Sequence, residues 1–226
     1  MRFLRTMQLP NAWLLASLVA LVLLYPFLDD HPAGRAAIAV FDLAILMLAL
    51  RAARAGGYET RIGWLLVVPA MLLHAGGALA QHEAVYVASL IAQAAFHAFV
   101  VSCLLRYMLR DEVMTLDELF AAAGLYVLMA FVFAYLYALV EHLAPGAFVL
   151  NDVNNPDGII SWWELLYFSF TCLTSVGFGE ITPVNDHARS LVMLQQMIGV
   201  LYLALVISRL VTLQAKRAER GRETDS

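Results

Sequence analysis

The sequence predicts an all-α membrane protein, and two observations carry this prediction. Hydrophobic residues make up 62% of the 226 residues and charged residues only 14%, whereas a soluble domain is about half apolar and about a quarter charged. The apolar residues also form runs of about 20, the length that crosses the hydrocarbon core of a bilayer as a helix. Six such runs lie at 12–29, 36–53, 63–80, 85–108, 116–140 and 188–213.

A further apolar stretch, 161–174, is too short to cross a bilayer. A short apolar segment between two spans is typical of a re-entrant helix, which enters and leaves the membrane on one side. Thr115 with Glu118, and Ser161 with Glu164, have the spacing of a capping box and predict where the fifth spanning helix and the short helix begin. We therefore expect six spanning helices and one re-entrant helix.

The basic residues predict the orientation. If the N-terminus lies in the cytoplasm, twelve of the 14 Lys and Arg residues lie at cytoplasmic ends, and only Arg35 and Arg189 lie outside. This asymmetry follows the positive-inside rule. We therefore expect a multi-pass protein of the cell membrane (inner or plasma), with both termini in the cytoplasm and the segment 141–187 on the outer face.

Charged residues cluster where the fourth run ends, and they divide the chain. We expect a four-helix transmembrane domain at 1–110, a second membrane domain at 111–214 and a short cytoplasmic tail at 215–226. The tail is too short for a soluble ligand-binding domain. Cys103 and Cys172 both lie in apolar runs, which predicts buried thiols rather than a disulfide or a metal site.

No nucleophile–base set, metal cluster or cofactor fingerprint is recognisable in the sequence. We therefore expect a protein that is not an enzyme, with no cofactor and no nucleic-acid partner.

The short segment runs directly into Thr174-Ser175-Val176-Gly177-Phe178-Gly179, which Glu180 follows. Two glycines around an aromatic residue are not expected of a lipid-facing helix, because extended backbone inside a bilayer is tolerated only where protein buries it or where it lines a water-filled path. Glycine adopts dihedrals that are closed to other residues, so successive carbonyl oxygens can point to one side. An ordinary glycine-rich turn is the alternative. The capped helix before it and the spanning helix on each side favour an ion filter.

The region 115–214 resembles the pore module of the potassium-channel superfamily, whose filter reads Thr-Val-Gly-Tyr-Gly followed by an acidic residue. Ser175 and Phe178 replace the usual Thr and Tyr, and ether-à-go-go type channels carry the same form of the filter. Those channels also have a Leu-Tyr-Phe pore helix, which a leucine followed by Tyr167 and Phe168 supplies here. Glu180 stands where the superfamily usually has Asp.

The resemblance implies a potassium-selective channel, in which rings of carbonyl oxygens replace the hydration shell of the ion. Because each chain carries one pore loop, a closed pore requires a homotetramer in the lipid bilayer, with K⁺ as the permeant ion. The filter residues implied are Thr174, Ser175, Val176, Gly177, Phe178 and Gly179, with K⁺ at Ser175, Val176, Gly177 and Phe178. The residues implied to support the filter are Tyr167, Phe168 and Glu180. The absence of a phenol hydroxyl at Phe178 predicts a softer filter that inactivates.

The resemblance also implies a hinge in the last helix. Gly199 lies in the neighbourhood where the superfamily carries its inner-helix hinge glycine, and close helix packing by a small residue explains it equally well. Val200, Leu203 and Ile207 share one helical face. In an ion cavity they would form an apolar gate that closes by dewetting, although ordinary helix packing explains the same stripe.

A six-helix layout with a pore at the end is that of a voltage-gated channel. Voltage sensing requires several charges that move through the field, usually an arginine at every third position of the fourth helix. Residues 85–105 contain no Arg or Lys, and Arg106 and Arg110 come only at the cytoplasmic end. The first domain is therefore voltage-sensor-like in layout but lacks the arginine ladder, and we expect a channel that is not strongly voltage-gated.

Asp42 is a candidate functional carboxylate within the membrane, or pairs internally with Arg51 or Arg54. His74 and His97 are predicted to be packing histidines.

Several titratable residues are expected around the outer mouth. They suggest external pH modulation, with a solvated loop as the alternative, and they are Glu141, His142, Glu180, Asp186 and His187. Gln195 and Gln196, in the outer half of the last helix, are predicted to pack behind the filter.

Two alternatives to a potassium-selective channel stay open. A weakly selective cation channel would follow if Phe178 weakens the rigidity of the filter, and a non-conducting membrane subunit could retain the pore fold.

Overall fold

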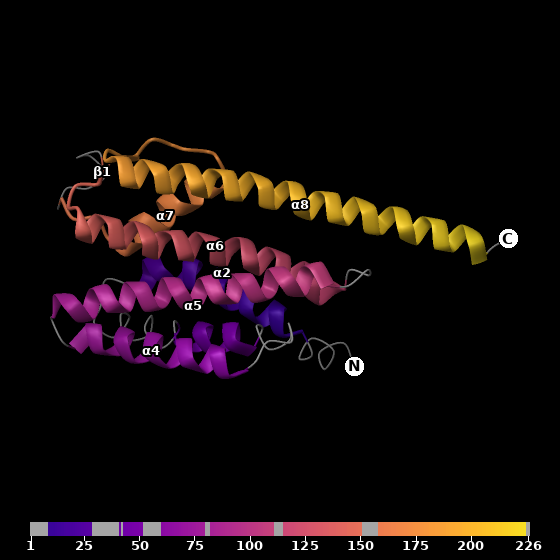
Figure 1. The fold of residues 1–226 in the computed structure, drawn as a ribbon, viewed down its shortest axis with the longest axis horizontal. Helices are drawn as coiled ribbons and strands as arrows, with labels where there is room; N and C mark the ends of the chain where they lie inside the picture. The colour runs from indigo at the N-terminus through magenta and orange to yellow at the C-terminus, as the bar shows by residue number, and fades with distance from the viewer. Residues whose placement is uncertain are drawn as a thin grey trace.

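The computed structural model describes residues 9–28, 41, 43–51, 60–79, 82–110, 115–150 and 158–224. Its elements are α2 (Pro10–Leu28), α4 (Thr60–Leu79), α5 (Glu83–Arg110), α6 (Leu116–Leu143), β1 (Phe148–Leu150), α7 (Trp162–Leu173), β2 (Ile181–Pro183) and α8 (Asp186–Thr224) (Figure 1). These helices follow the predicted apolar runs to within a few residues, except that α8 continues to Thr224. The prediction of a mostly helical membrane protein is confirmed, and the expected tail at 215–226 is helical for most of its length.

Four described helices are long and apolar enough to cross a membrane, namely Pro10–Leu28, Glu83–Leu109, Leu116–Leu143 and Asp186–Thr212. The apolar part described for α4, Arg61–Leu73, is shorter. Of the predicted run 36–53, residues 36–40, 42, 52 and 53 lie outside the described residues, and 43–51 is helical. The count of six spans therefore stays a prediction. Asp42, Arg54 and the side chain of His74 also lie outside the described part of the chain.

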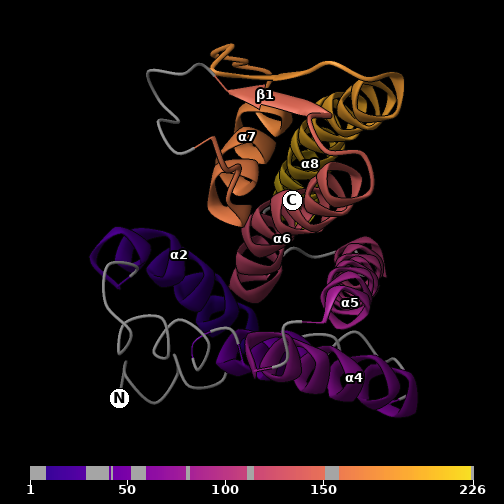
Figure 2. The same ribbon diagram turned by 90° about the vertical axis from the view of Figure 1, so that its left-hand side faces the viewer.

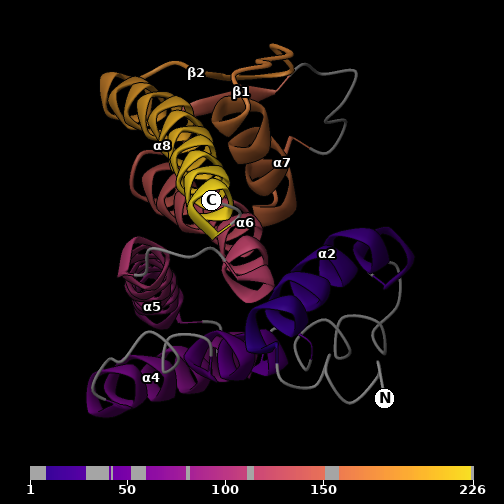
Figure 3. The same ribbon diagram turned by 90° about the vertical axis from the view of Figure 1, so that its right-hand side faces the viewer.

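α6 lies at the centre of the arrangement. α2 and α5 pack on one side of it, and α7 and α8 pack on the other (Figures 2 and 3). α4 lies against α5, on the side away from α7 and α8. Buried residues occur on several faces of α6, among them Leu125, Leu128, Phe131 and Tyr137. A helix that is apolar all round is expected where neighbouring elements cover every face.

Both predicted capping boxes are confirmed. At α6 the N–H of Glu118 donates to Thr115 Oγ1 at 3.2 Å, and the N–H of Thr115 donates to Glu118 Oε2 at 2.9 Å. At α7 the N–H of Glu164 donates to Ser161 Oγ at 3.3 Å, and the N–H of Ser161 donates to Glu164 Oε2 at 2.6 Å. Each box satisfies two backbone groups at a helix start without water.

The two short strands were not predicted. β1 pairs antiparallel with β2, with Phe148 opposite Pro183 and Leu150 opposite Ile181. The N–H of Val184 also donates to the carbonyl of Ala147 at 2.8 Å. The pairing joins the segment after α6 to the segment that follows the predicted filter.

Two of the residues expected at the outer mouth hold the end of α6 instead. The Glu141 carboxylate accepts hydrogen bonds from the N–H groups of Gly146 at 2.7 Å and Phe148 at 2.9 Å, which closes the turn into β1. His142 Nε2 lies 3.4 Å from the carboxylate of Glu83 at the start of α5. External pH modulation through these residues stays a prediction.

A buried carboxylate fastens three helices together at the other end of α6. Asp117 accepts hydrogen bonds from the backbone N–H of Asn11 at 3.2 Å and from its side-chain amide at 2.6 Å. The Tyr107 hydroxyl donates to the same carboxylate at 3.2 Å. Asn11 has no exposed surface and Asp117 is 9% exposed. The starts of α2 and α6 and the end of α5 are therefore held at one point.

We predict that Asn11→Ala and Asp117→Ala each lower the free energy of unfolding by about 1–3 kcal/mol, because each leaves a buried partner unpaired. The double variant is expected to lose less than the sum, with a coupling energy of about 1–3 kcal/mol. A double-mutant cycle measured by unfolding in detergent checks this, and strictly additive losses would contradict the contact.

Candidate functional site

The site is built on the end of α7. The last carbonyls of a helix have no intrahelical partner, and those of α7 are met by the residues that follow. The carbonyl of Phe170 accepts a hydrogen bond from the N–H of Thr174 at 3.0 Å. The carbonyl of Thr171 accepts two, from the N–H groups of Val176 at 3.0 Å and Gly177 at 3.2 Å. The backbone therefore turns back on the helix end as it leaves it.

The two remaining carbonyls of this helix end are satisfied as well. The carbonyl of Cys172 accepts a hydrogen bond from the N–H of Ser175 at 3.0 Å. The carbonyl of Leu173 accepts one from the Tyr126 hydroxyl of α6 at 3.2 Å. The helix can thus end where water is scarce, since no backbone acceptor of its last turn is left unpaired.

The backbone after the helix alternates in conformation. Ser175, Gly177 and Gly179 have φ values of 58°, 55° and 78°, and the residues between them do not have positive φ. In a regular strand successive residues face opposite sides. A left-handed residue at every second position instead turns neighbouring peptide groups toward the same side. Ser175 is the costly position, because a residue other than glycine rarely takes positive φ unless its surroundings impose it.

The alternation leaves a row of carbonyl oxygens available. Among the described residues, no hydrogen bond is accepted by a carbonyl of 175–179. Residues 174–180 are all exposed in the single chain, with Val176 at 54% and Phe178 at 66%. The three residues before them are buried. The expected filter residues Thr174–Gly179 therefore lie together on one open surface.

The residues expected to support the filter lie on α7 and just after the filter. The Tyr167 ring stacks on the Phe178 ring, with centroids 6.4 Å apart and planes 2° apart. Glu180 lies within electrostatic reach of the Tyr167 hydroxyl. Phe168 is 5% exposed and packs against Tyr137 at a ring distance of 5.3 Å. Tyr167 therefore contacts the filter through Phe178, and Glu180 lies near Tyr167. Phe168 instead packs α7 against α6.

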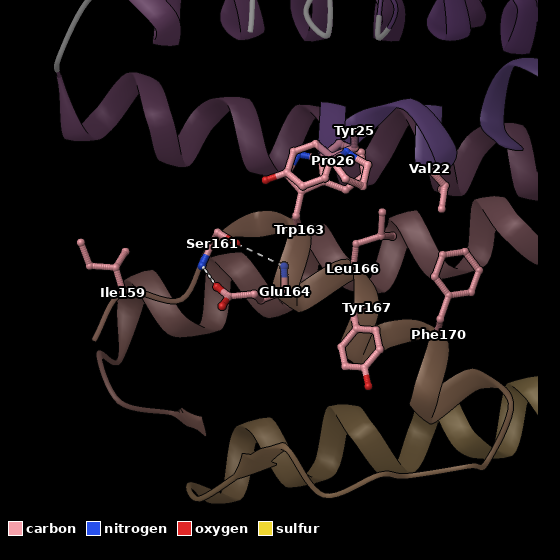
Figure 4. Close-up of a pocket in the computed structure, with 10 residues that line it drawn as sticks. All are labelled: Val22, Tyr25, Pro26, Ile159, Ser161, Trp163, Glu164, Leu166, Tyr167 and Phe170. Atoms are coloured by element: carbon pink, nitrogen blue, oxygen red, sulfur yellow. Dashed lines mark hydrogen bonds between the residues drawn. The ribbon is translucent and has the colours of Figure 1, made fainter. Parts of the chain in front are cut away.

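α2 contacts α7 near the start of α7. The Tyr25 ring stacks on Trp163 with centroids 3.7 Å apart, and a cavity of about 660 Å³ lies beside this stack (Figure 4). Tyr167 points away from α2 in the same view. Tyr167 also lines this cavity, which therefore extends from α2 to the residue that stacks on Phe178.

The segment that contains this site is similar to known proteins. Residues 122–215 match a family model described as ion channel. Over 73 residues the chain is 33% identical to the potassium channel protein Kcv of Paramecium bursaria Chlorella virus 1, and the alignment covers 32% of this chain and 77% of the viral protein. The chain belongs to the potassium-channel superfamily. No solved structure matches it.

The resemblance predicted from the sequence is thereby confirmed for the channel module. The family match begins at residue 122, so α2, α4 and α5 lie before it. Among the described residues, no group of three or more His, Cys, Asp or Glu side chains could hold a metal ion. In this member of the superfamily, the candidate ion ligands are backbone carbonyls.

A buried polar cluster within the channel module was only partly predicted. Gln195, which was predicted to pack behind the filter, packs against α7 and has no exposed surface. Its hydrogen-bond partners, Ser169 of α7 and Tyr137 of α6, were not singled out from the sequence. The signal available was a polar residue in the middle of each apolar helix, which does not identify its partner.

Gly199 gives α8 room to pass the end of α7. A methyl group at this position would overlap the carbonyl oxygen of Leu173 and lie 3.1 Å from its Cδ1 atom. The close-packing interpretation therefore accounts for the glycine in this structure. A hinge at Gly199 stays a prediction, because α8 is a single helix from Asp186 to Thr224 here.

The predicted gate stripe lies on the open side of α8. Val200, Leu203 and Ile207 are 55%, 43% and 60% exposed. The buried positions of this helix form a different stripe, which includes Gln195, Gly199 and Tyr202. The gate residues therefore face away from α6 and α7.

We predict that Gly199→Ala lowers the free energy of unfolding by about 1–3 kcal/mol, because the added methyl group forces α8 away from the Leu173 carbonyl. Gly124→Ala is the matched control, since a Cβ atom on this α6 glycine meets nothing within 4 Å. That change is expected to be neutral or stabilising by up to about 1 kcal/mol. Equal effects of the two substitutions on unfolding in detergent would contradict the packing role.

Proposed function

We propose that the chain forms a potassium-selective channel that conducts K⁺ passively through a pore built by four copies. The observation that carries the proposal is the alternation of φ over Ser175, Gly177 and Gly179 together with the free carbonyls of 175–179. Oxygen rings of this kind replace the hydration shell of K⁺ in known potassium channels. One pore loop in each chain makes four chains necessary. We assign K⁺ to the carbonyls of Ser175, Val176, Gly177 and Phe178.

The electrostatics of α7 support a cation at this place. The C-terminal end of a helix carries a partial negative charge, and α7 ends at Leu173, directly before the filter. No positively charged side chain lies between residues 158 and 186. A permeant cation would therefore meet carbonyl oxygens and a negative helix end without a competing charge on this segment.

The inner helix supplies the proposed gate. Leu203 and Ile207 present an apolar, exposed face together with Val200. Four copies of this face around an axis would line a cavity that closes by losing its water. Gly199, one turn before Leu203, is the proposed bending point, and its contact with Leu173 would couple such a bend to the end of the pore helix.

The four-helix part, 1–110, is proposed to lack a working voltage sensor. The buried polar residues of α5 are Ser89, Gln93 and His97, which are uncharged or weakly basic, and its arginines follow residue 105. Moving one charge through the field contributes only about 2.3 kcal/mol per 100 mV, so several charges are required for steep gating. We expect conductance to depend weakly on voltage.

The proposed placement in the membrane follows from the basic residues. The pore domain is 111–214, both termini lie in the cytoplasm, and the filter opens to the outside of the cell membrane. The filter then lies at the outer end of the proposed pore and the gate stripe of α8 toward the cytoplasm.

The test is the reversal potential of the purified protein in planar bilayers under opposed K⁺ and Na⁺ gradients. We predict a value near the K⁺ equilibrium potential, and a loss of this selectivity in Gly179→Ala, because alanine is strained at a φ of 78°. Gly124→Ala serves as the control. Robust current that reverses near zero would favour the weakly selective cation channel, and no current under any condition would favour a non-conducting subunit that retains the pore fold.

A further inference from the structure

We propose that Gln195, Ser169 and Tyr137 form a lock that positions the pore helix α7, and through it the filter. The inference rests on the proposed function, since it assigns positioning residues to that filter. None of the three residues touches the filter itself. Their role is to hold α7 in one rotation and at one depth between α6 and α8.

The lock uses all the side-chain donors of its members. Gln195 Nε2 donates to Ser169 Oγ at 2.7 Å and to the Ser169 carbonyl at 3.0 Å. Gln195 Oε1 accepts a hydrogen bond from the Tyr137 hydroxyl. Ser169 Oγ in turn donates to the carbonyl of Ala130 on α6 at 2.7 Å. α6 and α8 are thereby both hydrogen-bonded to Ser169 of α7.

The surroundings of the lock keep it away from water. Ser169, Gln195 and Tyr137 each have no exposed surface. A polar group that cannot reach water loses its hydrogen bond outright when its partner moves. The lock therefore disfavours any displacement of α7, whereas a purely apolar contact would allow it to slide.

A second contact lies one helical turn away in the same register. Leu173 follows Ser169 by four residues on α7, and Gly199 follows Gln195 by four residues on α8. Residues four apart lie on one face of a helix. The hydrogen bonds of Gln195 pull the two helices together, and the contact of Gly199 with the Leu173 carbonyl limits their approach. Together they fix both the rotation and the depth of α7.

Thr171 connects the lock to the filter. It lies between Ser169 and Leu173, and its carbonyl accepts the N–H groups of both Val176 and Gly177. If α7 turned or slid, this carbonyl would move away from both donors. The alternating backbone of the filter would then lose the bonds that hold its first half in place.

The test separates a positioning role from simple avoidance of unpaired polar groups. Gln195→Leu removes the acceptor that Gln195 offers to the Tyr137 hydroxyl and one of the two partners of Ser169 Oγ. The triple variant Tyr137→Phe/Ser169→Ala/Gln195→Leu removes all three polar side chains at once. Gln196→Leu is the matched control, since Gln196 is half-buried and has no hydrogen bond in the described part of the chain. Each full-length protein is examined in lipid with K⁺ by thermal unfolding and by hydrogen exchange of the Val176 and Gly177 amides.

We expect Gln195→Leu to lower the unfolding temperature and to speed exchange of the two amides by about tenfold. In the triple variant the unfolding temperature should recover, because no polar group is stranded, while exchange stays fast because α7 is no longer held. Gln196→Leu should match the unmodified protein in both measurements. Recovery of slow exchange in the triple variant would overturn the proposal, as would equal behaviour of Gln195→Leu and Gln196→Leu.

Electrophysiological recordings of the same variants distinguish a failure of this proposal from a failure of the proposed function. The triple variant should have a lower K⁺ to Na⁺ permeability ratio than the unmodified protein and Gln196→Leu. If the unmodified protein is itself unselective, the proposed function fails, while the exchange measurements still decide whether the lock holds the filter backbone.

Discussion

A helix that ends inside a membrane protein must satisfy its last carbonyl groups without water, and the second half of this chain is organised by that requirement. The N–H groups of Thr174, Ser175, Val176 and Gly177 meet it by turning back onto α7. Those bonds use the donors of the following segment and leave its carbonyls available. Two of the residues with positive φ, Ser175 and Gly177, are among those bonded to the helix end, and α8 passes the same helix end at Gly199.

Local pattern was sufficient to predict the helices and their starts. Apolar length predicted the long helices, the shortness of 161–174 predicted a short helix between two of them, and the capping boxes at Thr115 and Ser161 fixed where two helices begin. The glycines after 161–174 predicted a non-helical segment there, and Gly177 and Gly179 do have positive φ. In each case the deciding residues lie within a few positions of one another.

Contacts between distant segments were not predictable in this way. Asn11 and Asp117 are 106 residues apart, and nothing near either residue indicates the other. The partners of Gln195 and the pairing of the three-residue strands β1 and β2 likewise depend on how the helices pack. The predicted boundary near residue 110 is crossed by the contact of Asn11 with Asp117 and by the stacking of Tyr25 on Trp163. α2 therefore packs against the pore module at both of its ends.

The carbonyls of the alternating segment are the proposed ion ligands. Infrared spectroscopy of protein labelled with ¹³C at the carbonyls of Val176 and Gly177 tests this proposal most directly, because an ion that binds an oxygen shifts the stretching frequency of that carbonyl. The account predicts a shift of the labelled band when K⁺ replaces Na⁺, and no shift for a label at Leu201 on the exposed side of α8. A filter band that is the same in both ions would contradict it.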